Sequence, residues 1–201
     1  MYIIPVRGPT VVTSYMARSN GEYHQGLDIG TDRPESPDII AADAGVVTAV
    51  SWDAAGYGNY AILRHGSEYT LYGHMAYKPG VLTGQKLQHG DVIGVMGDTG
   101  NAEGRHVHFE IVVPPDPNNF WSADPRWKYH KNPFLEVPAF ADEYGQPALI
   151  AQKARWIAAI VTMTKLTEQA VTDALVSTGV LPPVVAPTPP SSHSSPAAPA
   201  A

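Results

Sequence analysis

Apolar and polar residues alternate in short runs through the first 140 positions of the chain, and Gly, Asn and Pro separate these runs. A period of two is typical of β-strands that bury one face. No helical repeat is apparent in this region, so the sequence predicts a mainly β domain with an antiparallel, sandwich-like sheet. The turn at Gly66-Ser67 predicts a hairpin. The strand candidates are residues 45–50, 59–65, 68–74, 91–96 and 106–113.

The pattern changes in the last third of the chain. Residues 114–146 are rich in Pro, Asn, Asp and aromatic side chains, which predicts an irregular segment. Apolar residues recur at helical spacing over 148–165, and Thr167 is a candidate N-cap for a second helix that runs to Ser177, with Gly179 as its stop. The Pro-, Ala- and Ser-rich end cannot bury enough apolar surface to order itself. We therefore expect a β domain over 1–140, a helical appendage over 147–179 and a disordered tail over 180–201.

Composition narrows the classes of function. The formal net charge is -6 and the pI is about 5.7, with no cluster of Lys and Arg, which argues against nucleic acid as a partner. The chain has no Cys, so a bound metal would need His and carboxylate ligands. No apolar run reaches the ~18 residues of a transmembrane segment. The first residues lack the pattern of a signal peptide.

Two histidines on one predicted strand are the strongest chemical signal. In His106-Val107-His108, alternation places both imidazoles on one face and Val107 on the other. Both rings could bind one ion, or one could bind while its neighbour transfers protons. Glu110 has the same parity, and it could orient an imidazole as a hydrogen-bond acceptor. The simpler interpretation, which we favour at this point, is a solvated side chain.

Two further segments carry candidate ligands. His24 and Asp28 lie in an extended or looped segment and offer a ring nitrogen and a carboxylate oxygen. His74 ends another strand, where alternation places it on the same face as Tyr72. Three separate segments thus carry a His near a turn, where active sites are often built. No role is predicted for His65, His89, His130 and His193.

The order of these motifs resembles the lysostaphin-type peptidoglycan metalloendopeptidases. The similarity covers residues 20–113, about half of the chain. Each piece is weak alone, but the combination in this order is specific. The matching segments are His24-Gln25-Gly26-Leu27-Asp28, Gly56-Tyr57-Gly58-Asn59-Tyr60, Tyr72-Gly73-His74-Met75, Gly90-Asp91-Val92-Ile93-Gly94, Gly97-Asp98-Thr99-Gly100 and His106-Val107-His108-Phe109-Glu110.

The resemblance implies a zinc site and the roles of five residues. Its metal ligands correspond to His24, Asp28 and His108, and its catalytic imidazoles to His74 and His106. Three protein ligands leave Zn²⁺ an open position for water, and the ion would lower the pKa of that water and polarise the scissile carbonyl. We expect His106 to help deprotonate the water and His74 to stabilise the oxyanion, or the reverse.

The expected function is zinc-dependent endopeptidase activity on the peptide cross-links of bacterial cell-wall peptidoglycan. Because the start of the chain lacks an export signal, we expect a bacteriophage protein, either an endolysin or a virion tail component. It would reside in the virion or in the host cytoplasm until lysis. The C-terminal helices would then bind other tail proteins or pack on the β domain; a weaker alternative is a membrane-surface helix over 148–163. The alternative function is a non-catalytic family member that serves as a tail subunit or activates another wall hydrolase.

Overall fold

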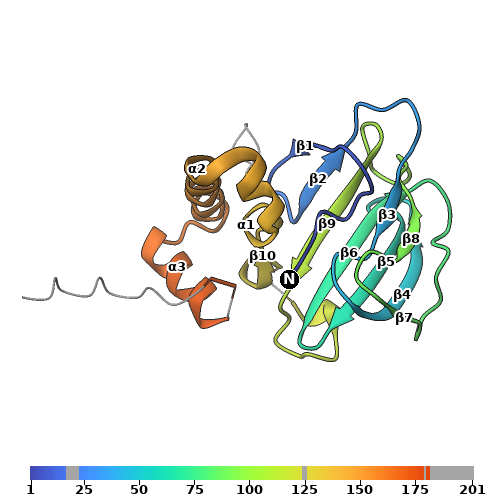
Figure 1. The fold of residues 1–201 in the computed structure, drawn as a ribbon. Coiled ribbons are helices and arrows are strands. Elements are labelled where there is room, and N and C mark those ends of the chain that lie inside the picture. The colour runs from blue at the N-terminus through green and yellow to red at the C-terminus, as the bar shows by residue number, and fades with distance from the viewer. Residues whose placement is uncertain (17–22, 124–125, 179, 182–201) are drawn as a thin grey trace, which may run out of the picture.

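The main sheet is antiparallel throughout and its strand order is β1-β2-β9-β6-β5-β4-β7, with β10 paired to β9 (Figure 1). The computed structural model describes residues 1–16, 23–123, 126–178 and 180–181. A smaller sheet pairs β3 with β8. The strands are β1 (Val11–Ser14), β2 (Leu27–Gly30), β3 (Asp38–Ile40), β4 (Gly45–Asp53), β5 (Gly58–His65), β6 (Glu68–Met75), β7 (Lys86–Leu87), β8 (Val92–Val95), β9 (His106–Val112) and β10 (His130–Lys131).

Strand β9 shows how alternation builds the core. Val107, Phe109 and Ile111 are fully buried in the main apolar cluster, which also contains Ile39 and Ile93 from the small sheet. The alternate residues of β9 face the other side of the large sheet; they are His106, His108, Glu110 and Val112. The predicted mainly β, antiparallel fold is confirmed, and one face of the large sheet is left to carry polar chemistry.

The hairpin predicted at Gly66-Ser67 joins β5 and β6, and all five predicted strands are present within three residues of their expected ends. Five other strands were not foreseen. They are two to four residues long, too short for a recognisable alternating pattern, and pairing with distant segments stabilises them. The unforeseen strands are β1, β2, β3, β7 and β10.

The helical part begins earlier than the sequence predicts. After 3₁₀ turns at Phe120–Ser122 and Arg126–Tyr129 come α1 (Pro133–Glu136), α2 (Pro138–Thr164) and α3 (Glu168–Ser177). The expectation of an irregular segment up to residue 146 is therefore wrong. Gly145 and Pro147 ordinarily end helices, but α2 continues through both of them. Pro138 occupies the start of the helix, where proline is well tolerated. The predicted cap of α3 is confirmed, because the Thr167 side chain accepts a hydrogen bond from Ala170 N. The predicted stop at Gly179 and the tail lie outside the described residues.

The C-terminal helices pack on the β domain beside β1 and β2 (Figure 1). Trp156 and Ile160 of α2 and Leu175 of α3 are buried against Met16 and Trp127. The apolar faces of the helices are thus buried within the chain. This agrees with the alternative in which the helices pack on the β domain. Among the described residues, none of the helices is both long and apolar enough to span a bilayer.

Candidate metal centre

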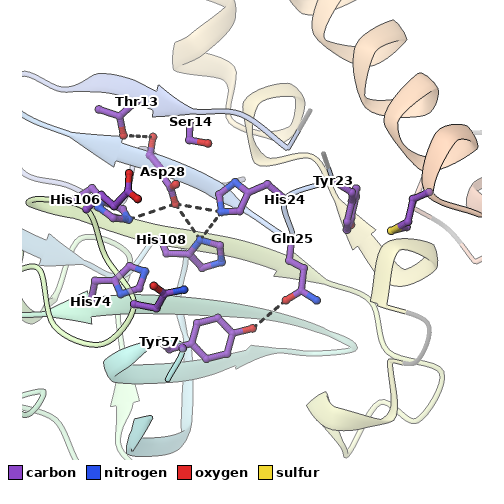
Figure 2. A pocket seen from close by; sticks show the side chains of 14 residues that line it. Thr13, Ser14, Tyr23, His24, Gln25, Asp28, Tyr57, His74, His106 and His108 are labelled. Carbon is purple, nitrogen blue, oxygen red and sulfur yellow. Dashed lines mark hydrogen bonds and ion pairs between the residues drawn. The ribbon is translucent and has the colours of Figure 1, made fainter. Parts of the chain in front are cut away.

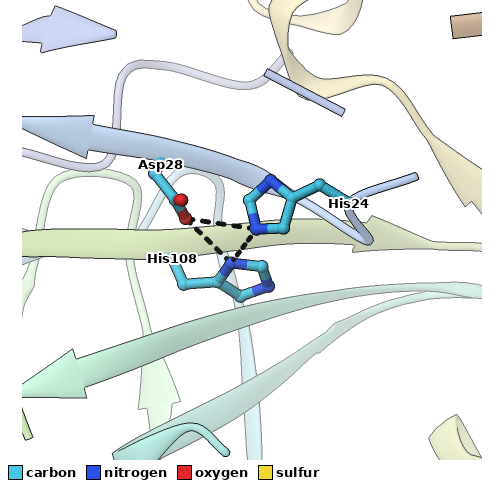
Figure 3. Close-up of side chains that lie close together, drawn as sticks. All are labelled: His24, Asp28 and His108. Atoms are coloured by element: carbon cyan, nitrogen blue, oxygen red, sulfur yellow. Dashed lines mark hydrogen bonds and ion pairs between the residues drawn. The ribbon is translucent and has the colours of Figure 1, made fainter. Parts of the chain in front are cut away.

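The register of β2 against β9 brings two of the predicted ligands together. Asp28 lies directly opposite His108, so their side chains share one face of the sheet. His108 Nδ1 lies 2.9 Å from Asp28 Oδ1 (Figure 3). Two segments that are 80 residues apart in the chain therefore meet because their strands are neighbours.

His24 completes the group from the turn before β2. Its Nε2 lies 3.0 Å from His108 Nδ1 and 3.4 Å from Asp28 Oδ1 (Figure 3). Gly26 permits this approach: a Cβ there would lie 2.5 Å from Phe109 O and 2.9 Å from the His108 ring. We infer that only glycine lets the turn pass so close to β9.

The three atoms fit a single small cation. Tetrahedral coordination with metal–ligand bonds of about 2.0–2.1 Å separates ligand atoms by about 3.3 Å. The observed separations of 2.9, 3.0 and 3.4 Å are close to that value. Two imidazole nitrogens and one carboxylate oxygen are also a donor set that zinc accepts. His24, Asp28 and His108 can therefore hold a metal ion.

The electrostatics of the centre also favour a positive charge. Burial alone would lower the pKa of His108, but its hydrogen bonds to Asp28 and Glu110 outweigh burial and raise that pKa to about 9. Burial would likewise raise the pKa of Asp28, but the hydrogen bond from His108 and the neighbouring imidazoles lower it. The two carboxylates thus create a negative potential at the point where the cation would bind.

His74 lies at the same centre because a β-bulge turns it there. Residues 73 and 74 lie opposite the single residue 60 of β5, and His74 has a φ of 60°, in the left-handed region. Its ring packs against those of His106 and His108, at centroid distances of 4.7 and 5.9 Å. Tyr72 instead packs on Phe109 in the core. The expectation that Tyr72 and His74 share a face is therefore wrong, because the bulge adds one residue to the alternation.

The segment Gly97-Asp98-Thr99-Gly100 fixes the orientation of His74. His74 Nδ1 donates to Thr99 O at 2.8 Å, and Thr99 Oγ1 donates to Met75 O at 2.7 Å. Gly100, with a φ of +75°, touches the backbone of Gly58, where a Cβ would lie 2.3 Å from Gly58 N. With Nδ1–H held in this way, His74 Nε2 carries the lone pair.

His106 is oriented in the same manner. Its Nδ1 donates to Gly104 O at 2.9 Å, and its Nε2 lies 3.6 Å from Asp28 Oδ1. Among the described residues, the group whose ligand atoms all lie within 4.8 Å of one another contains His108 and excludes His106. The spacing of the two histidines in the sequence could not distinguish them in this way.

Glu110 and His130 also belong to the centre. The sequence raised the role of imidazole acceptor for Glu110 but favoured a solvated side chain, and it gave no role to His130. Glu110 is fully buried, and its Oε1 accepts hydrogen bonds from His108 Nε2 at 3.1 Å and the Tyr57 hydroxyl at 2.7 Å. His130 Nε2 donates to Glu110 Oε2 at 2.9 Å. The expectation that Glu110 is solvated is therefore wrong. Burial would raise the pKa of Glu110, but His130 and His108 hold it well below its usual value. The parity of Glu110 with His108 was the available signal, and nothing in the sequence indicated His130.

The candidate metal ligands line a cleft of about 820 Å³ (Figure 2). All five predicted site residues face it. Figure 2 shows Tyr57 and Gln25 on one side of the centre, with Tyr23 further along the cleft. Met163, near the end of α2, also lines the cleft, so the C-terminal helices contribute to its wall.

The environment of His74 predicts a pH dependence of stability. Burial, together with the neighbouring His106 and His108, lowers the pKa of His74 to about 4, against 6.5 in an unfolded chain. Between these values the unfolded state binds the extra proton, so the free energy of unfolding falls as the pH falls. In the presence of chelator, we expect the wild type to lose stability relative to His74→Gln between pH 6.5 and 4, with a constant difference above pH 7.5.

Chemical denaturation at each pH measures this difference. The control is the same substitution at His89, which is exposed and lies outside the cleft. A difference between wild type and His74→Gln that stays constant across the window would contradict the assignment of a neutral, desolvated His74.

The chain is similar in sequence to known proteins. The family model "Peptidase family M23" matches residues 22–120. The chain is 36% identical over 114 residues to the peptidoglycan DD-endopeptidase ShyA of Vibrio cholerae, covering 56% of this chain and 24% of ShyA. It is 33% identical over 97 residues to the DD-carboxypeptidase/endopeptidase Mpg of Neisseria meningitidis, covering 48% and 21%. The chain thus spans about a fifth to a quarter of the length of these relatives.

A solved structure extends the similarity to the fold. The catalytic domain of the prophage-encoded M23 protein EnpA from Enterococcus faecalis superposes with a TM-score of 0.54 at 26% identity, covering 66% of this chain and 95% of that domain. Residues 22–120, which the family model matches, include all three proposed ligands and the two imidazoles beside them. By fold, motif order and family model, the chain belongs to peptidase family M23.

Proposed function

We propose that the protein is a zinc-dependent endopeptidase that cleaves peptide cross-links in bacterial peptidoglycan. One observation carries this proposal: three ligand atoms converge at the floor of a cleft where two further imidazoles present Nε2. This arrangement combines a metal site with groups that can move a proton.

His24, Asp28 and His108 would hold the ion, here proposed to be Zn²⁺. When bound, it supplies Lewis acidity to a carbonyl oxygen and acidity to a water molecule. Three protein ligands leave room for one more group, as catalytic zinc sites require.

His74 and His106 would move the proton. Backbone carbonyls hold Nδ1–H in each ring, which leaves Nε2 able to accept a proton from water and return it to the leaving amine. The low pKa of His74 keeps that ring neutral at neutral pH, and a neutral imidazole is the form that accepts a proton. Either ring is oriented to act as the base, while the other stabilises charge on the substrate.

The names of the relatives support a substrate class. ShyA is named as a DD-endopeptidase and Mpg as a DD-carboxypeptidase/endopeptidase. We therefore propose that this chain cleaves D-alanyl to diaminopimelate cross-links in preference to glycine bridges. An extended peptide could lie along the cleft between Tyr57 and Tyr23, and Met163 would contact it from α2.

Digestion of purified cell walls tests the substrate and the metal together. Walls with diaminopimelate cross-links and walls with glycine bridges are incubated with the protein, with and without chelator, and fragments are identified by mass spectrometry. We expect cleavage at the D-alanyl bond of the former, loss of cleavage with chelator, and recovery when Zn²⁺ is restored. Absence of new fragments from both walls, with zinc bound, would favour the non-catalytic alternative.

The phage context of the chain stays a prediction. The similarity to prophage-encoded EnpA supports it. Binding of other tail proteins by the C-terminal helices is likewise a prediction, and it would have to use surfaces other than the apolar faces that are buried against Met16 and Trp127.

A further inference from the structure

A buried carboxylate lies directly behind the proposed metal ligands and joins side chains from β9, from β10 and from the turn between β4 and β5. Glu110 lies between the imidazoles of His108 and His130, and its exposed fraction is 0%. The Tyr57 hydroxyl donates to the same oxygen as His108. A carboxylate in this position is costly unless donors compensate for the lost water. The three donors therefore hold it in one orientation.

This carboxylate determines which nitrogen of His108 can face a cation. His108 donates Nε2–H to Glu110 Oε1, so Nδ1 is the ring nitrogen that can lose its proton and offer a lone pair to a cation. Nδ1 is the atom that lies 2.9 Å from Asp28 and 3.0 Å from His24. Metal-binding histidines commonly donate their second N–H to a carboxylate in this way, which fixes the ring for coordination.

His130 holds the other oxygen of Glu110. It lies on β10, outside the residues that the family model matches. Pairing of β10 with β9 places His130 opposite Val112, next to Glu110 on the same face of β9. The exposed fraction of His130 is also 0%. A donor for Oε2 is thus supplied by a segment beyond the family motif.

We propose that His130 is a positioning residue for the metal centre: by anchoring Glu110, it fixes the His108 ring with Nδ1 toward the cation. The inference rests on the proposed metal site. It assigns His130 no contact with substrate, and its effect passes through Glu110 and His108 alone.

Affinity for zinc, measured on the full chain by competition with a chromophoric chelator, tests this role. We expect Glu110→Gln and His130→Leu to weaken binding by about 10- to 100-fold, the range typical of such supporting groups. His130→Gln keeps an N–H donor and should lose less than His130→Leu. The visible spectrum of the cobalt-loaded protein reports ligand geometry. It should therefore change less in His130→Gln than in His130→Leu.

Ile111→Val is the matched control for stability. Ile111 is adjacent to Glu110 but points into the core on the opposite face of β9. Losing one buried methyl group lowers stability without altering the carboxylate. This variant should therefore keep the affinity and cobalt spectrum of the wild type.

The outcomes separate this inference from the proposed function. If the wild type binds no zinc, the proposed function fails. If the wild type binds zinc and folded Glu110→Gln binds it equally well with the same cobalt spectrum, the positioning role is wrong. If both His130→Gln and His130→Leu bind zinc with the affinity of the wild type, His130 has no part in the positioning role. Should His130→Leu not fold, Glu110→Gln and His130→Gln decide the matter.

Discussion

His108→Ala is expected to abolish both metal binding and wall hydrolysis. His108 contacts the other two candidate ligands and is the side chain around which the centre is built. Loss of a direct ligand should weaken zinc binding by more than the roughly 100-fold that removal of a supporting group costs. Metal content after dialysis should fall from about one zinc per chain to near zero. Asp28→Asn, which keeps the shape but removes the charge, should behave similarly.

A stability measurement gives an independent readout of the same change. Zinc at about 100 times its dissociation constant should raise the free energy of unfolding of the wild type by about 2.7 kcal/mol. His108→Ala should show no such increase, whereas His89→Ala should retain it because His89 is exposed and lies outside the cleft. Equal zinc stabilisation of His108→Ala and the wild type would show that the ligand set is wrong.

His74→Ala and His106→Ala are expected to stop turnover while leaving the metal in place. Both rings face the cleft and neither belongs to the group of three ligand atoms. Removal of a general acid or base typically lowers the rate by about 10²- to 10⁴-fold. The rate of release of cross-linked peptides measures the loss, and zinc content is determined on the same preparations.

Metal content is the decisive control in this pair of variants. Both proteins should keep about one zinc per chain, with the affinity of the wild type. Loss of zinc from His106→Ala would mean that His106, rather than His108 alone, supplies a ligand from β9. Full activity in either variant would remove that residue from the proton transfer.

Alternation and motif order were sufficient to predict the type of fold and the candidate residues. A period of two is a local property, and it identified β9 and the common face of His106 and His108. The helix cap at Thr167 was also local, because its hydrogen bond spans three residues. The start of α2 was mispredicted because residues that usually end helices lie inside it, whereas Phe140 in its first turn is buried in the main apolar cluster.

The amino-acid sequence by itself determined which side chains are available, in what order they occur, and which of them share a face of β9. Only the tertiary structure decided how they combine. The bulge in β6 depends on its pairing with β5, and it moves His74 from the core face to the cleft. Burial of Glu110 depends on donors from Tyr57 and His130, which are remote in the chain. Strand register, bulges and buried charge pairs arise from contacts between distant segments, and no local periodicity encodes them.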